Sequence, residues 1–571
     1  MTEQAAANDS KHAFDLVVIG GGLAGLVAGV RATELGLRPL VLEQGDGADY
    51  PCNSRQSGGI LHIGFHDPFR PASELNDIIT RMTDGEARPA LAVALAGTGS
   101  RLITWLQEKG ARFMRFNQLE GYRWCLAPPR ALRAGIDWQN RGPDVVMRLL
   151  AKQLVIGGGV LKLRTRATSL IMESGSCVGV RGECDGKELS WLAPYCLIAD
   201  GGFQSNRELF ERNIGPDFEA VFQRGARTGK GAGLTMAMAV GASTTATNRF
   251  YGHLLCRDAL SNDKVWPYPE LDAIATAGIV VNQSGERIAD EGRTGVYIAN
   301  ALAGFPATSR FHVIFDSAIW DGAGRSARIP ANPLLEEAGG SIYRAESLEK
   351  LASLINVEPD KLRGSVDAYN AALAAGTLGQ LPIPRSERIK PLPITTGPFM
   401  AIAAMPGITY SMGGIATDEH AQVLDRDNAP IPGLLAAGAT TGGLEGGENA
   451  VYIGGLIKSG AFGMIAAERV ATLLKRSAPG EHTNRPASAL PPPGAPSGLA
   501  RYPALSTIVR YGKAAAIAGT ILTACLVGWL LWPVLGLAAM APALLVGMVV
   551  GFVLLSYAEL VQLITDLLIP N

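Results

Sequence analysis

Residues 14–43, FDLVVIGGGLAGLVAGVRATELGLRPLVLE, decide the fold of this chain. The stretch opens with an apolar run that is typical of a strand buried on both faces of a parallel sheet. A glycine-rich turn, a helical stretch and a second apolar run follow, which together make a βαβ unit of about 30 residues. The turn has the pattern G-x-G-x-x-G, formed by Gly20, Gly22 and Gly25, and Glu43 ends the second strand.

Each part of this unit suits a dinucleotide. Glycines allow a tight turn and a close approach of the backbone to a pyrophosphate, and the helix N-terminus attracts the phosphate charge. A carboxylate at the end of the second strand, where Glu43 lies, can bind ribose hydroxyls. The sequence therefore predicts a doubly wound α/β, Rossmann-like domain that binds a dinucleotide. The glycine pattern by itself does not distinguish FAD from NAD.

Length and composition limit the other possibilities. A chain of 571 residues is too long for a single core, so we expect two or more domains. A net charge of −1 offers no electrostatic footprint for nucleic acid. Seven scattered cysteines without a C-x-x-C pair argue against a disulfide framework and against a metal site, and they suit a reducing compartment.

The C-terminal part has a different composition. Residues 514–558 contain no Asp, Glu, Lys, Arg or His. A transmembrane helix needs about 20 apolar residues, so this stretch predicts a two-helix transmembrane hairpin over 511–560, with its turn at Pro533 or within 536–542. A buried soluble hairpin is the alternative. The polar N-terminal stretch predicts no secretory signal.

Charges around the apolar stretch suggest an orientation. Arg501, Arg510 and Lys513 precede it, whereas Glu559 and Asp566 follow it. The positive-inside rule then places the protein in the cytoplasmic membrane with the catalytic domain facing the cytoplasm. The hairpin contains no histidine, which excludes a bis-histidine haem site within it.

Shifts in composition divide the chain further. We expect a dinucleotide-binding domain in two parts, with an inserted second domain between them and a Pro-rich linker before the hairpin. The predicted ranges are 14–242 and 396–476 for the two parts of the binding domain, 243–395 for the inserted domain, 477–510 for the linker and 511–560 for the hairpin.

Several stretches together resemble one family. They are IGGGLAG with Glu43, NSRQSGG, IADGGFQSN, TGKGAGLTMAMAVGA, GERIADEG, YSMGGIATD and IPGLLAAGATTGG. The chain resembles the flavoprotein subunits of fumarate reductase and succinate dehydrogenase, a family that includes tricarballylate dehydrogenase and 3-ketosteroid Δ1-dehydrogenase. The phrases DEG, FYGHLL and GGLEGG are most similar to the tricarballylate dehydrogenase branch.

The resemblance implies FAD as the cofactor, and it implies that the inserted domain, 243–395, is an α+β capping domain that carries the substrate site. Extra glycine turns also suit a cofactor that lies extended through the domain. Covalent members of the family carry a His before a Gly-Gly turn; the comparable Cys52-Asn53-Ser54 has none, which implies non-covalent FAD, with a cysteinyl link through Cys52 as the alternative. The predicted FAD-binding residues are Gly20, Gly21, Gly22, Ala24, Gly25, Glu43, Gln44, Asn53, Ser54, Gly58, Gly59, Ala167, Asp200, Gly201, Gly202, Gly438, Gly454, Gly455 and Leu456.

The resemblance also suggests catalytic residues. Fumarate reductases have an arginine proton donor after the Glu of a stretch similar to GERIADEGRT; Arg293 is the candidate, although it lies two residues nearer Glu291 than that pattern expects. His253 lies where family members place a substrate-binding His. Tyr410 replaces a His two residues before MGG, and it can donate a hydrogen bond or act as a base. The structural alternatives are that Arg293 is a surface or salt-bridging arginine, His253 a core histidine and Tyr410 a packed aromatic residue.

The substrate site also departs from the family pattern. Fumarate reductases hold a carboxylate with an Arg in GANRLGG, whereas the corresponding GGENAVYIGG has Glu448, Asn449 and Tyr452 and no Arg. A bidentate clamp is therefore missing there, which favours a neutral substrate or a mono-acid. Asn449, Tyr452, His253 and Glu291 are the predicted substrate contacts. Lys458 is nearby but belongs on the following helix.

These observations predict a membrane-anchored, FAD-dependent oxidoreductase that acts on CH–CH groups. It would carry out α,β-dehydrogenation of a small carboxylic acid, or the reverse enoate reduction. Alternatives are an enzyme similar to 3-ketosteroid Δ1-dehydrogenase and a non-catalytic membrane flavoprotein that relays electrons. The expected partners are a small-molecule substrate, membrane lipid, and a quinone or a separate electron-transfer subunit, without nucleic acid.

Overall fold

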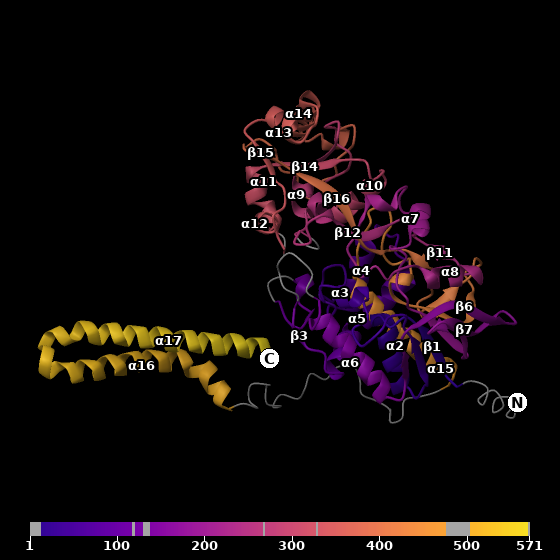
Figure 1. The fold of residues 1–571 in the computed structure, drawn as a ribbon, viewed down its shortest axis with the longest axis horizontal. Helices are drawn as coiled ribbons and strands as arrows, with labels where there is room; N and C mark the ends of the chain where they lie inside the picture. The colour runs from indigo at the N-terminus through magenta and orange to yellow at the C-terminus, as the bar shows by residue number, and fades with distance from the viewer. Residues whose placement is uncertain are drawn as a thin grey trace. The chain divides into compact units, whose positions relative to one another are not determined.

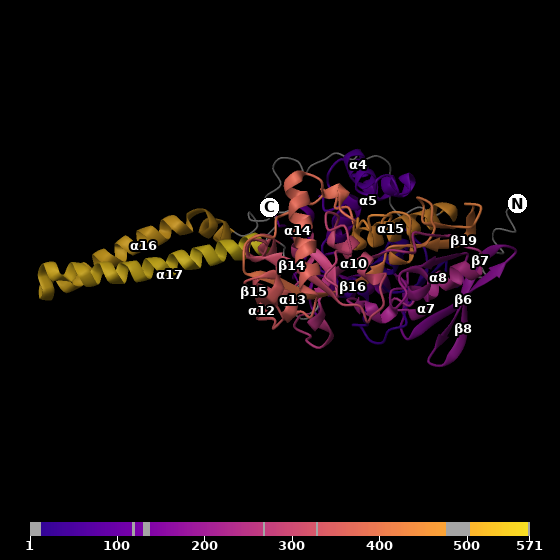
Figure 2. The same cartoon turned by 90° about the horizontal axis from the view of Figure 1, so that it is seen from above.

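The computed structural model describes residues 13–116, 120–129, 138–265, 269–326, 329–475 and 503–568. The chain divides into two compact units, Met1–Glu481 and His482–Asn571. Most of the predicted linker, 477–510, lies outside the described residues. Figures 1 and 2 show the fold of each unit.

A six-stranded sheet forms the centre of the first unit (Figure 1), in the order β18-β19-β9-β1-β2-β5. Five of its strands are parallel, and β18 joins one edge in the antiparallel sense. The strands are β1 (Leu16–Ile19), β2 (Pro39–Leu42), β5 (Val160–Lys162), β9 (Tyr195–Ile198), β18 (Gln422–Leu424) and β19 (Pro430–Ala436). This arrangement confirms the predicted α/β domain built on a mainly parallel sheet.

Both faces of this sheet are buried, as the apolar run in β1 predicts. Leu16 and Val18 belong to one hydrophobic core, while Val17 and Ile19 belong to another on the opposite face. The first core also contains residues of α2 (Leu23–Glu34), α5 (Pro89–Glu108), α6 (Gly142–Ile156) and α15 (Gly455–Leu473). A small antiparallel sheet covers part of the other face; its strands are β6 (Thr165–Glu173), β7 (Ser176–Cys184) and β8 (Lys187–Leu192).

A second sheet builds the cap around one long strand, β16 (Phe399–Ser411). Its partners are β10 (Phe222–Gln223), β12 (Phe250–Cys256), β14 (Phe311–Asp316) and β15 (Tyr343–Ala345), with β13 (Ile279–Asn282) beyond β14. The predicted boundary at 395/396 would assign β16 to the FAD-binding part, whereas its strand pairing places it at the centre of the second sheet. Hydrogen bonds between strands far apart in sequence place β16 in the second sheet, and composition alone gives no sign of such pairing.

The remaining elements of the first unit are helices and short pairings. The helices are α3 (Asn53–Gln56), α4 (Ala72–Met82), α7 (Arg207–Asn213), α8 (Ala232–Ala239), α9 (Asp272–Ala277), α10 (Gly295–Ala303), α11 (Ser317–Asp321), α12 (Ala331–Glu337), α13 (Leu348–Leu354) and α14 (Pro359–Ala375). The short strand pairs are β3 (Phe113–Met114) with β4 (Cys125–Leu126), and β11 (Thr244–Thr245) with β17 (Gly414–Ile415).

The second unit contains two helices that pack against each other (Figures 1 and 2). They are α16 (Pro503–Leu535) and α17 (Met540–Leu568), joined by a short turn at Gly536–Ala539. The turn lies in the predicted region 536–542, and Pro533 stays within α16. Within the described residues one helix, Ala516–Ala538, is long and apolar enough to cross a membrane, and Met540–Ser556 is a shorter apolar helix.

Candidate active site

The glycine-rich turn between β1 and α2 fits the close packing that its sequence predicts. Gly20 has φ +103°, and a Cβ there would lie 2.6 Å from the carbonyl oxygen of Ala199 on the neighbouring strand end. A Cβ on Gly25 would lie 2.0 Å from the carbonyl oxygen of Gly20. Ser54 accepts a hydrogen bond from the N–H of Leu23 at 3.1 Å, at the first turn of α2. Glycine is therefore required at two of the three motif positions by backbone contacts alone.

The third motif glycine faces open space. A Cβ on Gly22 would meet nothing nearer than the Ser54 hydroxyl, at 3.8 Å. Cβ atoms on Gly58 and Gly201 would meet nothing within 4 Å, and Gly201 has φ +90°. Open glycines on three separate turns leave backbone surface exposed where a cofactor can approach it. This geometry fits an extended dinucleotide that would be held by these turns.

Two buried carboxylates lie beside the turn. Glu43 accepts hydrogen bonds from the N–H groups of Gly21 (2.8 Å) and Gly45 (2.7 Å), and loss of solvation raises the pKa of its carboxyl group. Asp200 accepts one from the N–H of Gly233 (2.7 Å), and burial raises its pKa to about 6. Glu43 is thus at the end of β2, in the position that suits ribose hydroxyls.

The remaining predicted FAD residues lie on several elements of the first unit. Asn53 ties α3 to β16 and to the loop at Ala226, since its amide donates to Thr409 O (2.9 Å) and accepts from Ala226 N (2.8 Å). Cys52, beside it, has a thiol whose pKa is raised to about 11, chiefly by loss of solvation. The others are Ala24 in α2, Gln44 after β2, Gly59 with φ +78°, Ala167 in β6, Gly202, Gly438 with φ +86°, and Gly454, Gly455 and Leu456 at the start of α15.

An aromatic cluster lies beside the start of α15. Tyr251 and Tyr452 stack with ring centroids 3.9 Å apart, and Tyr410 lies 5.6 Å from Tyr251. Val296 of α10 and Met412, which follows β16, complete a small apolar core with these rings. The N–H of Gly455 donates to the Tyr452 hydroxyl at 3.0 Å. The cluster therefore joins the cap to the first turn of α15.

The edge of this cluster reaches solvent. His62 packs edge-on against Tyr452, with ring centroids 5.4 Å apart, and stacks on Phe65, which is 46 % exposed. Burial, with a contribution from His66, lowers the pKa of His62 to about 4. His62 is therefore neutral near pH 7, in agreement with its Nδ1 accepting a hydrogen bond from the N–H of Phe65. His62 and Phe65 therefore form an uncharged, mainly apolar rim at the solvent edge of the aromatic cluster.

Tyr410 is anchored by a buried ion pair. Its hydroxyl donates to Glu445 at 2.9 Å, and Lys458 of α15 pairs with the same carboxylate. The side chains of Lys458 and Glu445 are 2 % and 1 % exposed. Burial and the nearby negative charge of Glu445 raise the pKa of Tyr410 well above its ordinary value. Tyr410 is therefore protonated near pH 7, which suits a hydrogen-bond donor better than a base.

His253 has both ring nitrogens engaged. Its Nδ1 lies 2.6 Å from Asp272 Oδ2, and its Nε2 lies 3.0 Å from the Tyr251 hydroxyl. Asp272 also accepts a hydrogen bond from the N–H of Leu254 at 2.9 Å. The structure thus places His253 behind Tyr251 rather than at the surface of the aromatic cluster. Its predicted direct contact with substrate stays a prediction.

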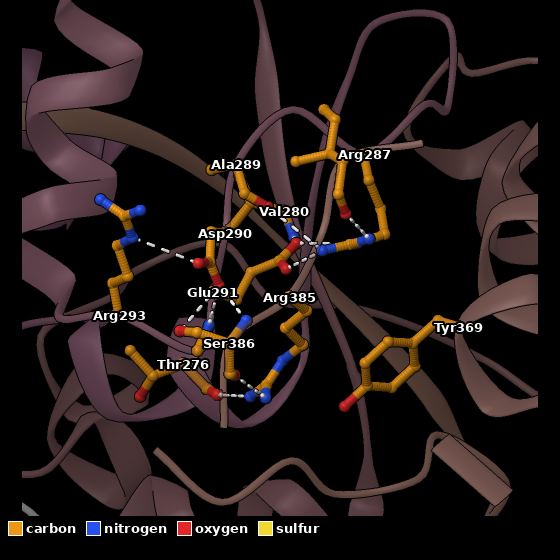
Figure 3. A network of polar contacts seen from close by, with 12 residues as sticks. Thr276, Val280, Arg287, Ala289, Asp290, Glu291, Arg293, Tyr369, Arg385 and Ser386 are labelled. Atoms are coloured by element: carbon orange, nitrogen blue, oxygen red, sulfur yellow. Dashed lines mark hydrogen bonds and ion pairs between the residues drawn. The ribbon is translucent and has the colours of Figure 1, made fainter. Parts of the chain in front are cut away.

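Arg293 is paired with two acidic side chains. Its guanidinium lies 3.2 Å from Asp290, as Figure 3 shows, and 3.3 Å from Glu448, which is exposed. It also lies over the ring of Tyr297, at 4.5 Å from the centroid. Arg293 is 23 % exposed. A proton-donor role for Arg293 therefore requires these contacts to change, and it stays a prediction.

The other two predicted substrate residues have structural partners. Glu291 is completely buried in the cap, where it accepts from the N–H of Val280 at 2.9 Å and pairs with Arg287 (Figure 3). Asn449 donates to Asp84 at 2.5 Å in a partly exposed network. Of the predicted site residues, the structure brings together Tyr410, Tyr452 and His253, and it engages Glu291 and Asn449 elsewhere.

Sequence reasoning missed several members of this site. Tyr251 shares the phrase FYGHLL with His253, and alternation along a strand puts the two side chains on one face, so period-2 reading could have found it. Lys458 was set aside, and Glu445 had no distinguishing signal. Asp272 comes from α9, and only the fold brings it to His253.

Comparisons with known proteins settle the family. The family described as an FAD binding domain matches residues 15–450, well over half of the chain. The chain belongs to this family. It comprises the FAD-dependent oxidoreductases related to fumarate reductase and succinate dehydrogenase flavoproteins, so the predicted family, cofactor and enzyme class are confirmed.

Individual relatives are distant. The chain is 23% identical to an NADH:fumarate oxidoreductase of Klebsiella pneumoniae over 78% of this chain, but the match spans only 46% of that longer protein. It is 25% identical to a 4-oxocyclohexanecarboxylate 2-dehydrogenase of Sinomonas cyclohexanicum, over 76% of this chain and 88% of the relative. The solved 3-ketosteroid Δ1-dehydrogenase of Sterolibacterium denitrificans has a TM-score of 0.62 at 19% identity, covering 81% of this chain and 99% of that one. That likeness shows the fold.

Proposed function

We propose that this protein oxidises or reduces a carbon–carbon bond next to the carbonyl or carboxylate of a small mono-acid with a flat or ring-shaped body. The observation that carries this proposal is the tyrosine cluster of Tyr251, Tyr410 and Tyr452 at the start of α15, where the family pattern would place an arginine clamp. Stacked phenol rings favour flat apolar groups, and they offer hydroxyls for one polar group.

Local charges support one carboxylate rather than two. Lys458 is neutralised by Glu445, and Arg293 is shared between Asp290 and Glu448. A dicarboxylate needs two compensated anionic groups, each best held by a bidentate guanidinium. Arg293, at the cap, is a cation that could pair with a single substrate carboxylate if that carboxylate replaced its exposed partner Glu448. This supports the predicted mono-acid over a fumarate-like substrate.

The residues around the turns described above would hold FAD, which supplies hydride uptake or donation when bound. The chain's own groups do the rest. Tyr410, which its high pKa keeps protonated, would turn its single O–H from Glu445 to a carbonyl or carboxylate oxygen of the substrate and polarise it. The stacked pair Tyr251 and Tyr452 orients the substrate body and excludes water. Non-covalent attachment is part of the proposal, because the high pKa of the Cys52 thiol disfavours a reactive thiolate.

Membrane anchoring is also proposed for the second unit. Large apolar side chains on its helices are exposed, among them Trp529 and Phe552, each at 73 %. Exposed apolar surface of this extent is typical of a segment that lies in lipid. The cytoplasmic orientation rests on the flanking charges alone, and transfer of electrons to a quinone or a separate subunit rests on the anchor.

A second candidate is a dehydrogenase of ketosteroids. The three tyrosines favour it, because phenol groups can both polarise a ketone and handle a proton. A larger apolar substrate would also have to pass the exposed Phe65 and the neutral His62 at the rim. The two candidates differ in substrate size and charge, so direct comparison separates them.

The test is a substrate panel with the full-length protein purified in detergent. Unsaturated acids (fumarate, crotonate and cinnamate) are offered with reduced benzyl viologen, and 4-oxocyclohexanecarboxylate and 4-androstene-3,17-dione with an oxidising dye. We expect turnover with a mono-acid and little with fumarate. Turnover confined to fumarate would contradict the mono-acid proposal, and turnover confined to the steroid would favour the second candidate. A non-catalytic electron relay predicts no turnover with any of them and flavin oxidation by quinone alone.

A further inference from the structure

We propose that Tyr251 is the catalytic residue that exchanges a proton with the substrate. His253 and Asp272 form a relay that positions the Tyr251 hydroxyl and accepts its proton. This inference rests on the proposed function, because it names the group that handles the proton in that reaction. It replaces Arg293 in the role that the family resemblance suggests for it.

The relay is built on one strand and one helix start. Tyr251 and His253 alternate on β12, so both side chains leave the same face, with a register irregularity between Tyr251 and Gly252. Asp272 is the first residue of α9. The three groups form a continuous chain, from the Tyr251 hydroxyl through His253 Nε2 (3.0 Å) and from His253 Nδ1 to Asp272 (2.6 Å). An aspartate on Nδ1 fixes the tautomer in which Nδ1 carries the proton, so Nε2 accepts from the tyrosine.

Asp272 is held firmly in this position. Its second oxygen accepts from the N–H of Leu254, the residue after His253. Gly295, at the start of α10, leaves the space that Asp272 fills, since a Cβ there would lie 2.1 Å from Asp272 Cγ. Position 295 is also where the family pattern would place its arginine, two residues beyond Arg293. An arginine side chain at 295 and the relay therefore exclude each other sterically.

Other charged groups complete the surroundings of His253. Glu270 Oε2 lies 3.5 Å from Nδ1, and its other oxygen is paired with Arg224 at 2.8 Å. The phenol of Tyr251 faces the rings of Tyr410 and Tyr452 on its other side. Both carboxylates lie beside Nδ1, so Nε2 is left to the Tyr251 hydroxyl. The histidine can thus receive the tyrosine proton at Nε2.

The proton moves between three groups. In the direction of dehydrogenation, the Tyr251 oxygen takes the proton from the carbon next to the carbonyl, while its own proton moves to His253 Nε2. Asp272 compensates the imidazolium charge. The substrate would lose two electrons as a hydride, and bound FAD would supply the hydride acceptor. In the direction of reduction each proton moves in reverse, so no further reactant is needed.

The main experiment compares Tyr251→Phe with Tyr369→Phe in the FAD-loaded, full-length protein. Tyr369 is a matched control, because its hydroxyl donates to Leu392 O within the cap core. We expect Tyr251→Phe to lower kcat by about 10²-fold or more with little change in KM, and Tyr369→Phe to leave both unchanged. Arg293→Gln should raise KM, because Arg293 is proposed to bind the substrate carboxylate, and should keep more than a tenth of the wild-type kcat. If Tyr251→Phe keeps turnover while Arg293→Gln loses it, the inference is overturned.

A second measurement follows the proton without electron transfer. The wild-type protein, in D₂O without an electron acceptor, should exchange the hydrogens next to the ketone of 4-oxocyclohexanecarboxylate for deuterium, and Tyr251→Phe should not. His253→Ala should lose exchange too and regain part of it with added imidazole, which a purely structural role would not allow. Exchange that survives in Tyr251→Phe overturns the inference. Wild-type turnover of no panel substrate defeats the proposed function instead.

A third measurement needs no substrate. The Nδ1 proton shared by His253 and Asp272 should give a far-downfield proton NMR signal that is lost in Asp272→Asn and shifted in Tyr251→Phe. Absence of this signal in the wild type overturns the relay. His253, Glu270 and Asp272 could also hold a cation, since their ligand atoms lie within 4.8 Å of one another. A stoichiometric metal whose removal by EDTA abolishes activity would likewise overturn it.

Discussion

Lys458 and Glu445 provide a direct test of how the interior beneath Tyr410 is stabilised. Both side chains are almost fully buried and pair with each other. We expect Lys458→Met to destabilise the protein by about 3–5 kcal/mol, because it leaves the Glu445 carboxylate buried without its cation. Methionine has a similar shape to the lysine stem, so lost packing contributes little to this loss.

The double variant separates buried charge from packing. In Lys458→Met/Glu445→Leu no charge stays buried, and we expect most of the stability to return. The remaining loss should be about 1 kcal/mol, because the Tyr410 hydroxyl no longer has Glu445 as its acceptor. The double variant should therefore be more stable than the single variant, whereas additive losses from the two substitutions would make it less stable.

Thermal unfolding of the full-length protein, with saturating FAD and detergent, measures the effect. A specific unfolding entropy of about 2.1 cal/mol/K per residue gives about 1 kcal/mol/K for the first unit, so a loss of 4 kcal/mol lowers Tm by about 4 °C. Arg363→Met is the control; it breaks an exposed pair with Glu349 at 3.0 Å and should cost less than about 1 kcal/mol. The reasoning is refuted if Lys458→Met costs no more than the control, or if the double variant is the least stable of the three.

Three further predictions concern the cofactor, a buried acid and the anchor. Gly22→Val should abolish FAD binding, because its side chain enters the open space at the turn, and acid precipitation of the wild type should leave the flavin in the supernatant; flavin in the denatured pellet would show a covalent link. Asp200→Asn should stabilise the protein at pH 7.5 by up to about 3 kcal/mol, since the Asp200 pKa rises from 3.8 to about 6. The cost of burying the ionised carboxylate is absent below about pH 4, grows between about pH 4 and 6 and is complete above about pH 6. A gain in urea midpoint that is independent of pH would contradict this prediction. Full-length protein should sediment with membranes and show no haem Soret band, whereas truncation after about residue 480 should give a soluble yellow protein that is active with a dye; soluble full-length protein would disprove the anchor.

The main sheet and the cofactor turn were predictable because they depend on local pattern. An apolar run, three glycines at fixed spacing and a terminal Glu43 define one βαβ unit that lies within about 30 consecutive residues. The alternation of Leu16 to Ile19 between two cores follows from the same pattern. The apolar stretch 514–558 indicated apolar helices for a similar reason; within the described residues one helix, Ala516–Ala538, is long and apolar enough to cross a membrane.

The active site required the tertiary structure. Tyr251, Asp272, Glu445 and Lys458 are separated by up to 207 positions, yet hydrogen bonds join them into two networks beside one aromatic cluster. The sequence determined which residues could carry charge or donate protons. It could not determine their partners, because strand pairing across the cap and the close approach of Gly295 to Asp272 set those distances. For this protein the local pattern of the chain predicted a dinucleotide-binding turn, and long-range packing decided which side chains lie together beside it.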